Sequence, residues 1–250
     1  MNSVRVSFVI PCYNHGVFLQ EALRSISSQT FQDYEVIVVN DGSTDPATNR
    51  LLDQLAGEGL QVLKTANRGP AAARNLAISK AQGEYILPLD ADDRVAPRFL
   101  EMAVAELDKD PELRVVCGRV EFFGERTGEW VLPDYTPAQI LLDNMIVATS
   151  LFRCEDWRRH GGFREDMRTG WEDWDFWLSL LASGGRVKRL DEVVLYYRIR
   201  SDSRDRTLDF RQKLVLMLKM VARHRAFYLK YWRPYLVLLA KRIFQRLSYE

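Results

Sequence analysis

The stretch GEYILPLDADD places three aspartates directly after an apolar segment that is typical of a buried strand. The carboxylates of Asp90, Asp92 and Asp93 lie within four residues of sequence, so they repel one another and raise each other's pKa. A chain that keeps such a cluster usually holds a cation there, and carboxylate oxygens suit divalent cations such as Mg²⁺ and Mn²⁺. The aspartates therefore indicate a metal site, with a solvated loop that caps a helix as the alternative.

Two other kinds of site with clustered aspartates are excluded by neighbouring residues. In a calcium EF-hand loop beginning at Asp90, an oxygen ligand and a glycine belong where Arg94 and Val95 stand. A phosphatase of the haloacid-dehalogenase type would have an aspartate pair after its first strand, where this chain has Pro-Cys-Tyr-Asn. The histidines have no metal-ligand spacing, and we expect them to be structural: His15, His160 and His224.

A second acidic pair, Glu172 and Asp173, opens a predicted amphipathic helix after a loop that contains Gly161 and Gly162. The helix dipole alone favours acids in a first turn, which leaves a structural role open. Aromatic rings beside carboxylates are also typical of sugar sites, because C–H faces pack on rings while hydroxyls bind acids. One face of the helix belongs to the core, with apolar residues at i, i+3, i+4 and i+7: Trp174, Trp177, Leu178 and Leu181.

Arg74 lies in an alanine-rich predicted helix that begins near Gly69. The N-terminus of this helix offers an anion site, but the default expectation for Arg74 is an exposed surface side chain. The chain contains neither G-x-G-x-x-G nor G-x-x-x-x-G-K-[ST], which disfavours dinucleotide-binding and P-loop functions.

Strand-like and helix-like segments alternate through the first 125 residues, which predicts an α/β fold with a mostly parallel sheet and helices on both faces. Asp45 followed by Pro46 is an N-cap signal with a first-turn proline, and it agrees with this division. The expected strands are 4–10, 35–39, 61–63, 85–89 and 114–123, and the expected helices are 17–28, 46–56, 71–80 and 97–107.

Ligands of open parallel sheets bind at the carboxyl ends of the strands, where the strand order reverses. Residues 11–14, 40–45 and 90–93 each follow a predicted strand, so we expect them to meet at one edge of the sheet. Beyond residue 125 the pattern weakens. It predicts loops around a short helix at 138–144 and a strand at 193–199.

The composition is that of an ordinary globular protein, with 250 residues and 47% hydrophobic content, enough for a substantial core. The cysteines are widely spaced and suggest neither a disulfide framework nor a zinc site, which favours a reducing compartment. The one apolar run near the start stops at Pro11 and is too short for a signal peptide or a membrane span. We therefore expect a cytoplasmic protein.

Residues 211–250 contain ten Lys or Arg and one acid, whereas the first 210 residues contain 25 Lys or Arg and 33 acids. Apolar and aromatic residues are interspersed with these basic residues, and Pro234 is expected to divide the segment into two helices. Two interpretations stay open: an amphipathic element on an anionic membrane surface, at the inner face of the membrane, or a helical hairpin packed on the rest of the chain. Nucleic acid is not an expected partner, because no recognised module accompanies the charge.

In this order, the motifs resemble the inverting glycosyltransferases of family 2, which have the GT-A (Rossmann-like) fold. Any one motif is weak, but six in sequence between residues 4 and about 200 are specific. The matching stretches are Pro11-Cys12-Tyr13-Asn14, Asn40-Asp41-Gly42-Ser43-Thr44-Asp45, Asn67-Arg68-Gly69 with Ala73-Arg74-Asn75, Gly83-Glu84-Tyr85-Ile86 leading to Asp90-Ala91-Asp92-Asp93, Gly161-Gly162-Phe163, and Trp171-Glu172-Asp173.

The resemblance implies a nucleotide-sugar donor, usually a UDP-sugar, and a glycan or lipid-linked glycan acceptor. Asp92 would ligate Mn²⁺ or Mg²⁺ on the diphosphate, and Asp173 would be the general base that deprotonates the acceptor hydroxyl. The nucleotide would contact Pro11, Tyr13, Asn14, Asp41, Arg74, Asp90 and Ala91. Within that set, Tyr13 and Pro11 would line the base, Asp41 and Arg74 would hydrogen-bond it, and Asp90 would face the ribose. Acceptor or diphosphate contacts would come from Trp171, Glu172, Arg198 and Arg200.

Two positions depart from the family pattern. Many members have Asp where this chain has Asn40, which leaves Asp41 as the acidic contact to the base. Many have a metal-binding histidine where Arg200 stands. Because a protonated arginine cannot ligate a metal, we expect Arg200, or Arg198, to contact the diphosphate directly.

The resemblance implies a GT-A domain over 1–204, with a nucleotide-sugar-binding half (1–125) and an acceptor-binding half (126–204). It does not explain the basic amphipathic tail, 205–250. Two alternatives to an active transferase are a catalytically inactive sugar-binding or scaffold protein of the same fold, and a sugar-phosphate nucleotidyltransferase. The second lacks support, because the glycine-rich loop that such enzymes have after the first strand is replaced here by Tyr13-Asn14-His15.

Overall fold

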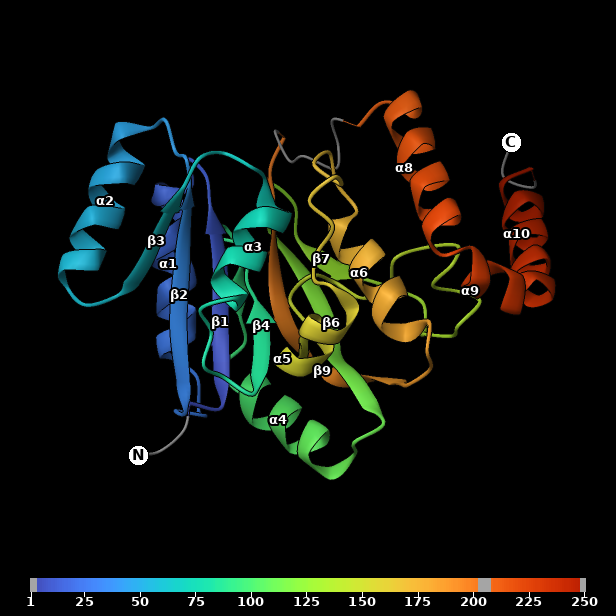
Figure 1. Ribbon diagram of the computed structural model, residues 1–250, viewed down its shortest axis with the longest axis horizontal. Helices are drawn as coiled ribbons and strands as arrows, with labels where there is room; N and C mark the ends of the chain where they lie inside the picture. The colour runs from blue at the N-terminus through green and yellow to red at the C-terminus, as the bar shows by residue number, and fades with distance from the viewer. Residues whose placement is uncertain (1–3, 202–207, 248–250) are drawn as a thin grey trace.

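The computed structural model describes residues 4–201 and 208–247, and Figure 1 shows a central sheet with helices on both of its faces. Its elements are β1 (Val6–Cys12), α1 (Gly16–Ser27), β2 (Tyr34–Asp41), α2 (Pro46–Gly57), β3 (Gln61–Thr65), α3 (Pro70–Ile78), β4 (Tyr85–Pro88), β5 (Arg94–Val95), α4 (Phe99–Lys109), β6 (Leu113–Gly124), β7 (Gly128–Trp130), β8 (Leu151–Arg153), α5 (Cys154–His160), α6 (Glu172–Leu181), β9 (Arg186–Ile199), α8 (Phe210–Arg223), α9 (Arg225–Lys230) and α10 (Trp232–Leu247).

The strands lie in the order β3-β2-β1-β4-β8-β6-β9-β5, and β7 pairs with β6. Strands β1 to β4 are mutually parallel, as are β6 and β9, whereas β8, β5 and β7 pair antiparallel to their neighbours. The chain adds β2 and β3 on one side of β1 and then crosses to add β4 on the other. This reversal makes the carboxyl ends of β1 and β4 a crevice suited to a ligand, and the predicted mostly parallel α/β sheet is confirmed.

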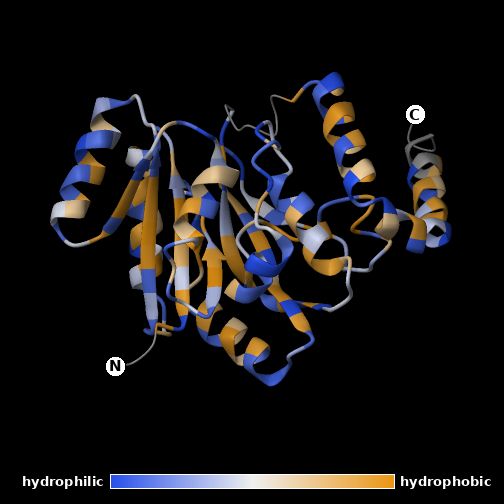
Figure 2. Cartoon of the chain, in the orientation of Figure 1, coloured by the Kyte–Doolittle hydropathy of each residue, from blue (hydrophilic) through white to orange (hydrophobic). Residues whose placement is uncertain are grey.

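The sheet separates two hydrophobic clusters. One lies under α3, α5 and α6 and includes Phe176 and Trp177. The other lies under α1, α2 and α4 and includes Leu19, Leu52 and Phe99. The strands between them are apolar on both sides, as expected for a parallel sheet that is covered on both faces, and they appear as orange ribbons in Figure 2.

The expected short helix at 138–144 was wrong, because residues 137–142 form turns. Side chains from other parts of the chain bind two carbonyls of this segment. The indole N–H of Trp174 donates to the carbonyl of Ile140 (2.7 Å), and the hydroxyl of Tyr228 donates to the carbonyl of Leu141 (3.0 Å). The apolar side chains of Ile140 and Leu141 are nevertheless buried, so the segment contributes to the core without being helical.

The helices of the basic tail have a buried face, which packs on the rest of the chain, and an exposed apolar face. Leu216 and Met220 of α8 and Phe227 of α9 are buried against the α6 side of the sheet. On α8, an exposed apolar stripe at i, i+4, i+8 and i+11 faces away from the domain: Phe210, Leu214, Leu218 and Val221. Among the described residues, no helix is long and apolar enough to cross a membrane.

Candidate active site

A pocket of about 820 Å³ lies at the carboxyl ends of β1, β2 and β4 and is also lined by the start of α6. The sequence prediction placed thirteen residues at a site, and twelve of them line this one pocket: Pro11, Tyr13, Asn14, Asp41, Arg74, Asp90, Ala91, Asp92, Trp171, Glu172, Asp173 and Arg200. Arg198 does not line it. The pocket therefore brings together residues 11–14 and residues 171–173, which are remote in sequence.

Two residues of the pocket have a left-handed backbone that side chains other than glycine rarely adopt. They are Asn14, with φ of 57°, and Trp171, with φ of 63°. The side chain of Asn14 holds the β2–α2 loop, because its Oδ1 accepts the backbone N–H groups of Thr44 (2.8 Å) and Asp45 (2.9 Å). Such strained positions persist where surrounding contacts fix them, and they cluster at functional sites.

Asn40 and Asp41 hold neighbouring loops from the end of β2. The Oδ1 of Asn40 accepts the N–H of Ser43 (2.9 Å). The two Asp41 oxygens accept the N–H groups of Arg68 (2.9 Å) and Gly69 (2.8 Å), at the start of α3. Burial raises the pKa of Asp41, although these N–H groups act in the opposite direction. A carboxylate has about four acceptor positions, so Asp41 can still accept a hydrogen bond from a ligand.

Arg74 is buried, with a side chain only 3% exposed, which corrects the expectation of a surface arginine. Its guanidinium forms ion pairs with Asp90 at 2.6 Å and with Glu172 at 2.8 Å. Burial alone would lower the pKa of the guanidinium, but the two carboxylates raise it, so Arg74 stays charged. Arg74 thus joins the end of β4 to the start of α6 across the floor of the pocket.

The carboxylates of Asp92 and Asp93 are held in a low-dielectric environment. Burial raises the pKa of Asp92, and the negative charge of Asp90 adds to the rise. The pKa of Asp93 lies well above its usual value for the same reasons. A positive charge placed beside Asp90 and Asp92 would relieve this repulsion.

The donor set fits a divalent cation that is shared with a ligand. Within the described parts of the chain, no group of three or more His, Cys, Asp or Glu side chains is placed to hold a metal by itself. Carboxylates of Asp90 and Asp92 nevertheless line the same pocket. Mg²⁺ is commonly held by one or two carboxylates together with phosphate oxygens and water, which is what this arrangement can supply.

The two arginines after β9 have different positions. Arg200 lines the pocket, with Nη1 3.3 Å from Oδ2 of Asp92 and Nη2 3.1 Å from Nε2 of His15. A guanidinium can only donate, so His15 accepts this hydrogen bond as a neutral imidazole. Arg198 instead lies behind the aspartates, where it pairs with Glu21 and donates from Nε to the Asp92 carbonyl (2.8 Å). Of the two arginines predicted to contact a diphosphate, Arg200 is therefore the one that lines the pocket.

Asp173 lines the same pocket as Asp92 and lies in the first turn of α6. One of its oxygens accepts the N–H of Trp174 (2.8 Å), and the other accepts the side-chain amide of Asn144 (3.0 Å). Sequence analysis missed Asn144 and the pocket position of His15. Their partners lie 29 and 185 residues away in sequence, and no motif connects them. The aromatic rings of Trp130 and Tyr197 line the same pocket and were also missed.

The sequence profile described as Glycosyl transferase family 2 matches residues 7–175, which is more than half of the chain. EpsE of Bacillus subtilis (strain 168) is 35% identical over 214 residues, which cover 81% of this chain and 76% of that protein.

Two solved structures have the same fold. TarS 1–349 of S. aureus in complex with UDP-GlcNAc superimposes with a TM-score of 0.71 at 23% identity, covering 87% of this chain and 66% of that chain. The mannosyltransferase PcManGT from Pyrobaculum calidifontis, in complex with GDP-Man and Mn²⁺, gives a TM-score of 0.64 at 22% identity, covering 97% of this chain and 80% of that chain. At these identities the likeness shows the fold, and the predicted GT-A fold is confirmed. This chain spans slightly less than two thirds of the TarS chain.

Proposed function

Because the chain belongs to glycosyl transferase family 2, we propose that it moves a sugar from a UDP-sugar to a hydroxyl of a glycan or lipid-linked glycan, with inversion at the anomeric carbon. One observation carries the proposal. A single pocket is lined by the Asp90–Asp93 cluster after β4, by Arg200 after β9 and by Asp173 at the start of α6. A direct displacement needs both kinds of group around one substrate, because the leaving group departs from one face of the anomeric carbon while the base acts at the other.

The nucleotide half of the donor fits the edge made by β1, β2 and β4. We propose that Tyr13, whose ring is 41% exposed at this edge, and the backbone of Pro11 line the base. Asp41 accepts a hydrogen bond from the base in addition to its two backbone partners. Arg74 then acts mainly on protein groups, since Asp90 and Glu172 already occupy its guanidinium.

We propose that the diphosphate lies next to Arg200 and Asp92. The guanidinium of Arg200 can donate two hydrogen bonds to phosphate oxygens, and neutral His15 holds it from the other side. Asp92, with Asp90 beside it, would hold a divalent cation. When bound, Mn²⁺ or Mg²⁺ neutralises negative charge on the leaving diphosphate.

Asp173 is proposed as the general base. The amide of Asn144 and the N–H of Trp174 fix the orientation of its carboxylate, which lines the pocket where the acceptor hydroxyl is proposed to bind. Asp173 takes the hydroxyl proton as the acceptor oxygen forms its bond to the anomeric carbon and the bond to the diphosphate breaks. A single displacement of this kind inverts the anomeric configuration.

Calorimetric titration of UDP with and without Mn²⁺ tests the donor site. We expect Mn²⁺ to strengthen UDP binding to the unaltered chain, and we expect Asp92→Ala to abolish that effect of Mn²⁺. Asp53→Asn, which changes an exposed carboxylate paired with Lys64, serves as the matched control. Equal Mn²⁺ dependence in Asp92→Ala would remove Asp92 from the metal site. Absence of binding by UDP and by other nucleoside diphosphates would favour the inactive-scaffold alternative.

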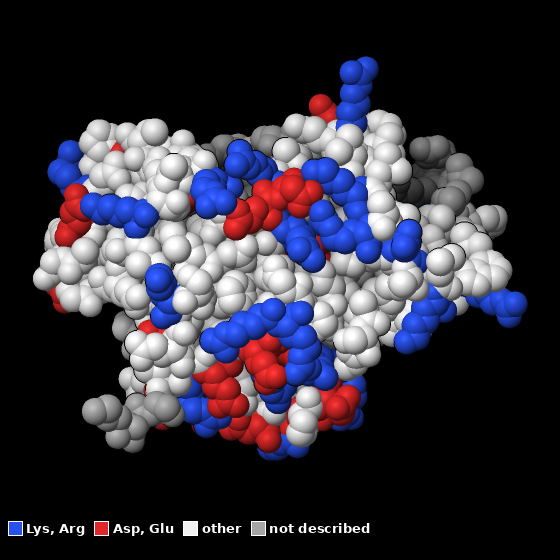
Figure 3. All heavy atoms as spheres, viewed as in Figure 1, with Lys and Arg blue, Asp and Glu red and all other residues white. Residues whose placement is uncertain are grey.

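We further propose that the tail binds the anionic cytoplasmic leaflet of a membrane, which would bring the enzyme to lipid-linked acceptors. The apolar stripe of α8 is exposed, and Lys and Arg side chains gather over α9 and the start of α10 at the right of Figure 3. Apolar residues beside basic ones favour an anionic lipid surface, to which each Lys or Arg near the surface adds about 1 kcal/mol.

Sedimentation with lipid vesicles tests this surface. We expect the chain to bind vesicles that contain phosphatidylglycerol, to bind vesicles of phosphatidylcholine weakly, and to be released by salt. Leu214→Ser with Leu218→Ser should weaken binding, whereas Val131→Ser, which alters an exposed apolar residue elsewhere, should not. If the chain forms dimers in solution and ignores both kinds of vesicle, the stripe is a contact between copies instead.

A further inference from the structure

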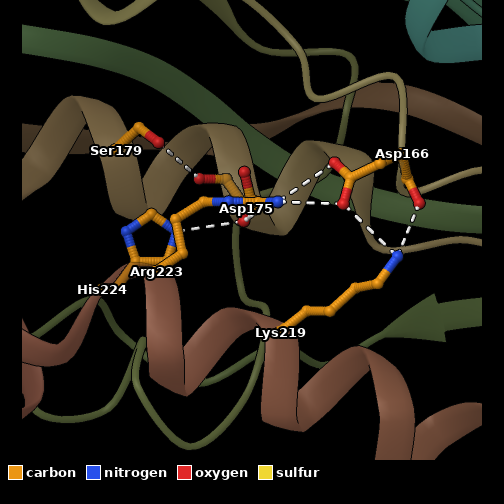
Figure 4. Close-up of polar contacts among 6 residues, drawn as sticks. All are labelled: Asp166, Asp175, Ser179, Lys219, Arg223 and His224. Carbon is orange, nitrogen blue, oxygen red and sulfur yellow. Dashed lines mark hydrogen bonds and ion pairs between the residues drawn. The ribbon is translucent and has the colours of Figure 1, made fainter.

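A cluster of buried charges joins the tail to α6, as Figure 4 shows. Asp175 is completely buried, and its Oδ1 lies 2.7 Å from Nη1 of Arg223 and 3.1 Å from Nε2 of His224. Its Oδ2 has no hydrogen-bond partner among the described residues. The hydrogen-bond partners that this carboxylate has in the described structure therefore come from the end of α8 and the residue after it.

Arg223 also reaches a second carboxylate. Its Nη2 lies 3.0 Å from both oxygens of Asp166, and Nζ of Lys219 lies 3.3 Å from Oδ2 of the same residue. Partial burial would raise the pKa of Asp166, but the positive charges of Arg223 and Lys219 lower it. One guanidinium thus bridges a carboxylate in the loop before α6 and a carboxylate inside α6.

The bridged segment is the one that carries the proposed chemistry. Asp166 precedes Trp171 by five residues, and Asp175 follows Asp173 by two. Between them the backbone turns through the left-handed conformation of Trp171, and the N–H of Asp175 donates to the carbonyl of Trp171 (3.0 Å). A turn of this kind is costly and needs contacts on both sides to hold it.

We infer that Arg223 is a positioning residue, which holds Trp171, Glu172 and Asp173 in place by clamping Asp166 and Asp175 together. The inference rests on the proposed role of Asp173 and adds a function for the tail. The tail helix would be part of the working site although it contributes no pocket residue among those described. Arginine suits the task because its planar fork can bind two carboxylates at once, which a lysine ammonium on a flexible stem does less well.

Arg223→Lys tests the clamp, because it keeps the charge beside buried Asp175 and removes the fork. We expect three results. Hydrogen exchange of the peptide that spans 166–176 becomes faster, while exchange over β1 to β3 is unchanged. Hydrolysis of UDP-GlcNAc, followed as UDP release, slows about tenfold to a hundredfold, in line with the cost of a misplaced catalytic group. UDP affinity stays the same, so the loss lies in kcat.

Asp166→Asn is the second variant, since it weakens the outer half of the clamp at a half-exposed side chain and leaves Asp175 paired. It should speed hydrogen exchange of the same peptide and slow UDP release, each to a smaller extent than Arg223→Lys does. Arg159→Gln breaks an exposed ion pair on α5 and is the control, with no expected effect on exchange at 166–176 or on rate.

Three outcomes decide the matter. Unchanged exchange and UDP release in Arg223→Lys would overturn the inference, as would faster exchange throughout the chain with weaker UDP binding, which would mean general destabilisation. If the unaltered chain releases no UDP from any UDP-sugar, the proposed function fails, and exchange at 166–176 alone then decides whether Arg223 orders the segment.

Discussion

Asp173→Asn is expected to bind UDP as the unaltered chain does and to transfer sugar about a hundredfold to ten-thousandfold more slowly, the usual contribution of a general base. The substitution keeps the size of the side chain and one of its two acceptor oxygens, which can serve Asn144 or the N–H of Trp174, but it removes the ability to take a proton. UDP is proposed to bind at the ends of β1, β2 and β4, whereas Asp173 lies at the start of α6, so the titration should be unaffected. Release of UDP in steady state, beside calorimetric titration of UDP, measures both quantities.

The matched control for this variant is Asp134→Asn, which alters a side chain that is 94% exposed. It should have no effect on rate or binding. Loss of UDP binding in Asp173→Asn would mean that Asp173 supports the donor site and not the acceptor. An unchanged rate would show that another group takes the proton.

Arg74→Met should have the largest effect on stability. It leaves Glu172 buried without its cation, and removal of one partner from a buried ion pair costs about 3–5 kcal/mol. For a chain of this size such a loss lowers Tm by about 6–20 °C, which thermal unfolding will detect. The variant should also lose turnover of the UDP-sugar, because Arg74 fixes Asp90 beside the proposed metal site.

A second substitution distinguishes the effect of the unpaired charge on stability from the effect of lost packing in Arg74→Met. Adding Glu172→Gln removes the stranded carboxylate and should recover much of the lost Tm without recovering activity. Arg68→Gln, which alters an exposed ion pair with Glu165 near the same helix, is the control. A Tm for Arg74→Met within 2 °C of the unaltered chain would contradict the assignment of Arg74 as the bridge, since about 1 kcal/mol or less would then be involved.

The parallel half of the fold could be predicted from sequence because its signals are local. Each strand is a short apolar run, and caps such as Asp45 mark the helices. The strand-end residues could be placed together because topology alone brings the carboxyl ends of neighbouring parallel strands to one edge. Short strands that pair with distant partners carried no such signal, and β5, β7 and β8 were missed.

Other features depend on contacts that no local pattern reveals. Arg74 was expected at the surface, because an alanine-rich helix does not show that carboxylates 16 and 98 residues away will enclose it. The segment 138–144 has helix-like apolar spacing, yet an indole and a phenol from other parts of the chain bind its carbonyls. The support of Asp173 by Asn144 likewise depends on how those turns fold. Such tertiary contacts override local propensity.

The bridge made by Arg74 limits how the chain can be recombined with its relatives. Asp90 belongs to the part of the chain that is proposed to bind the donor, and Glu172 belongs to the part that is proposed to bind the acceptor. A chimera that exchanges one part alone would take Arg74 and Asp90 from one parent and the residue at position 172 from the other. Donor and acceptor preference can therefore be exchanged separately only between parents that share this triad, and the triad marks the first positions to match when such hybrids are designed.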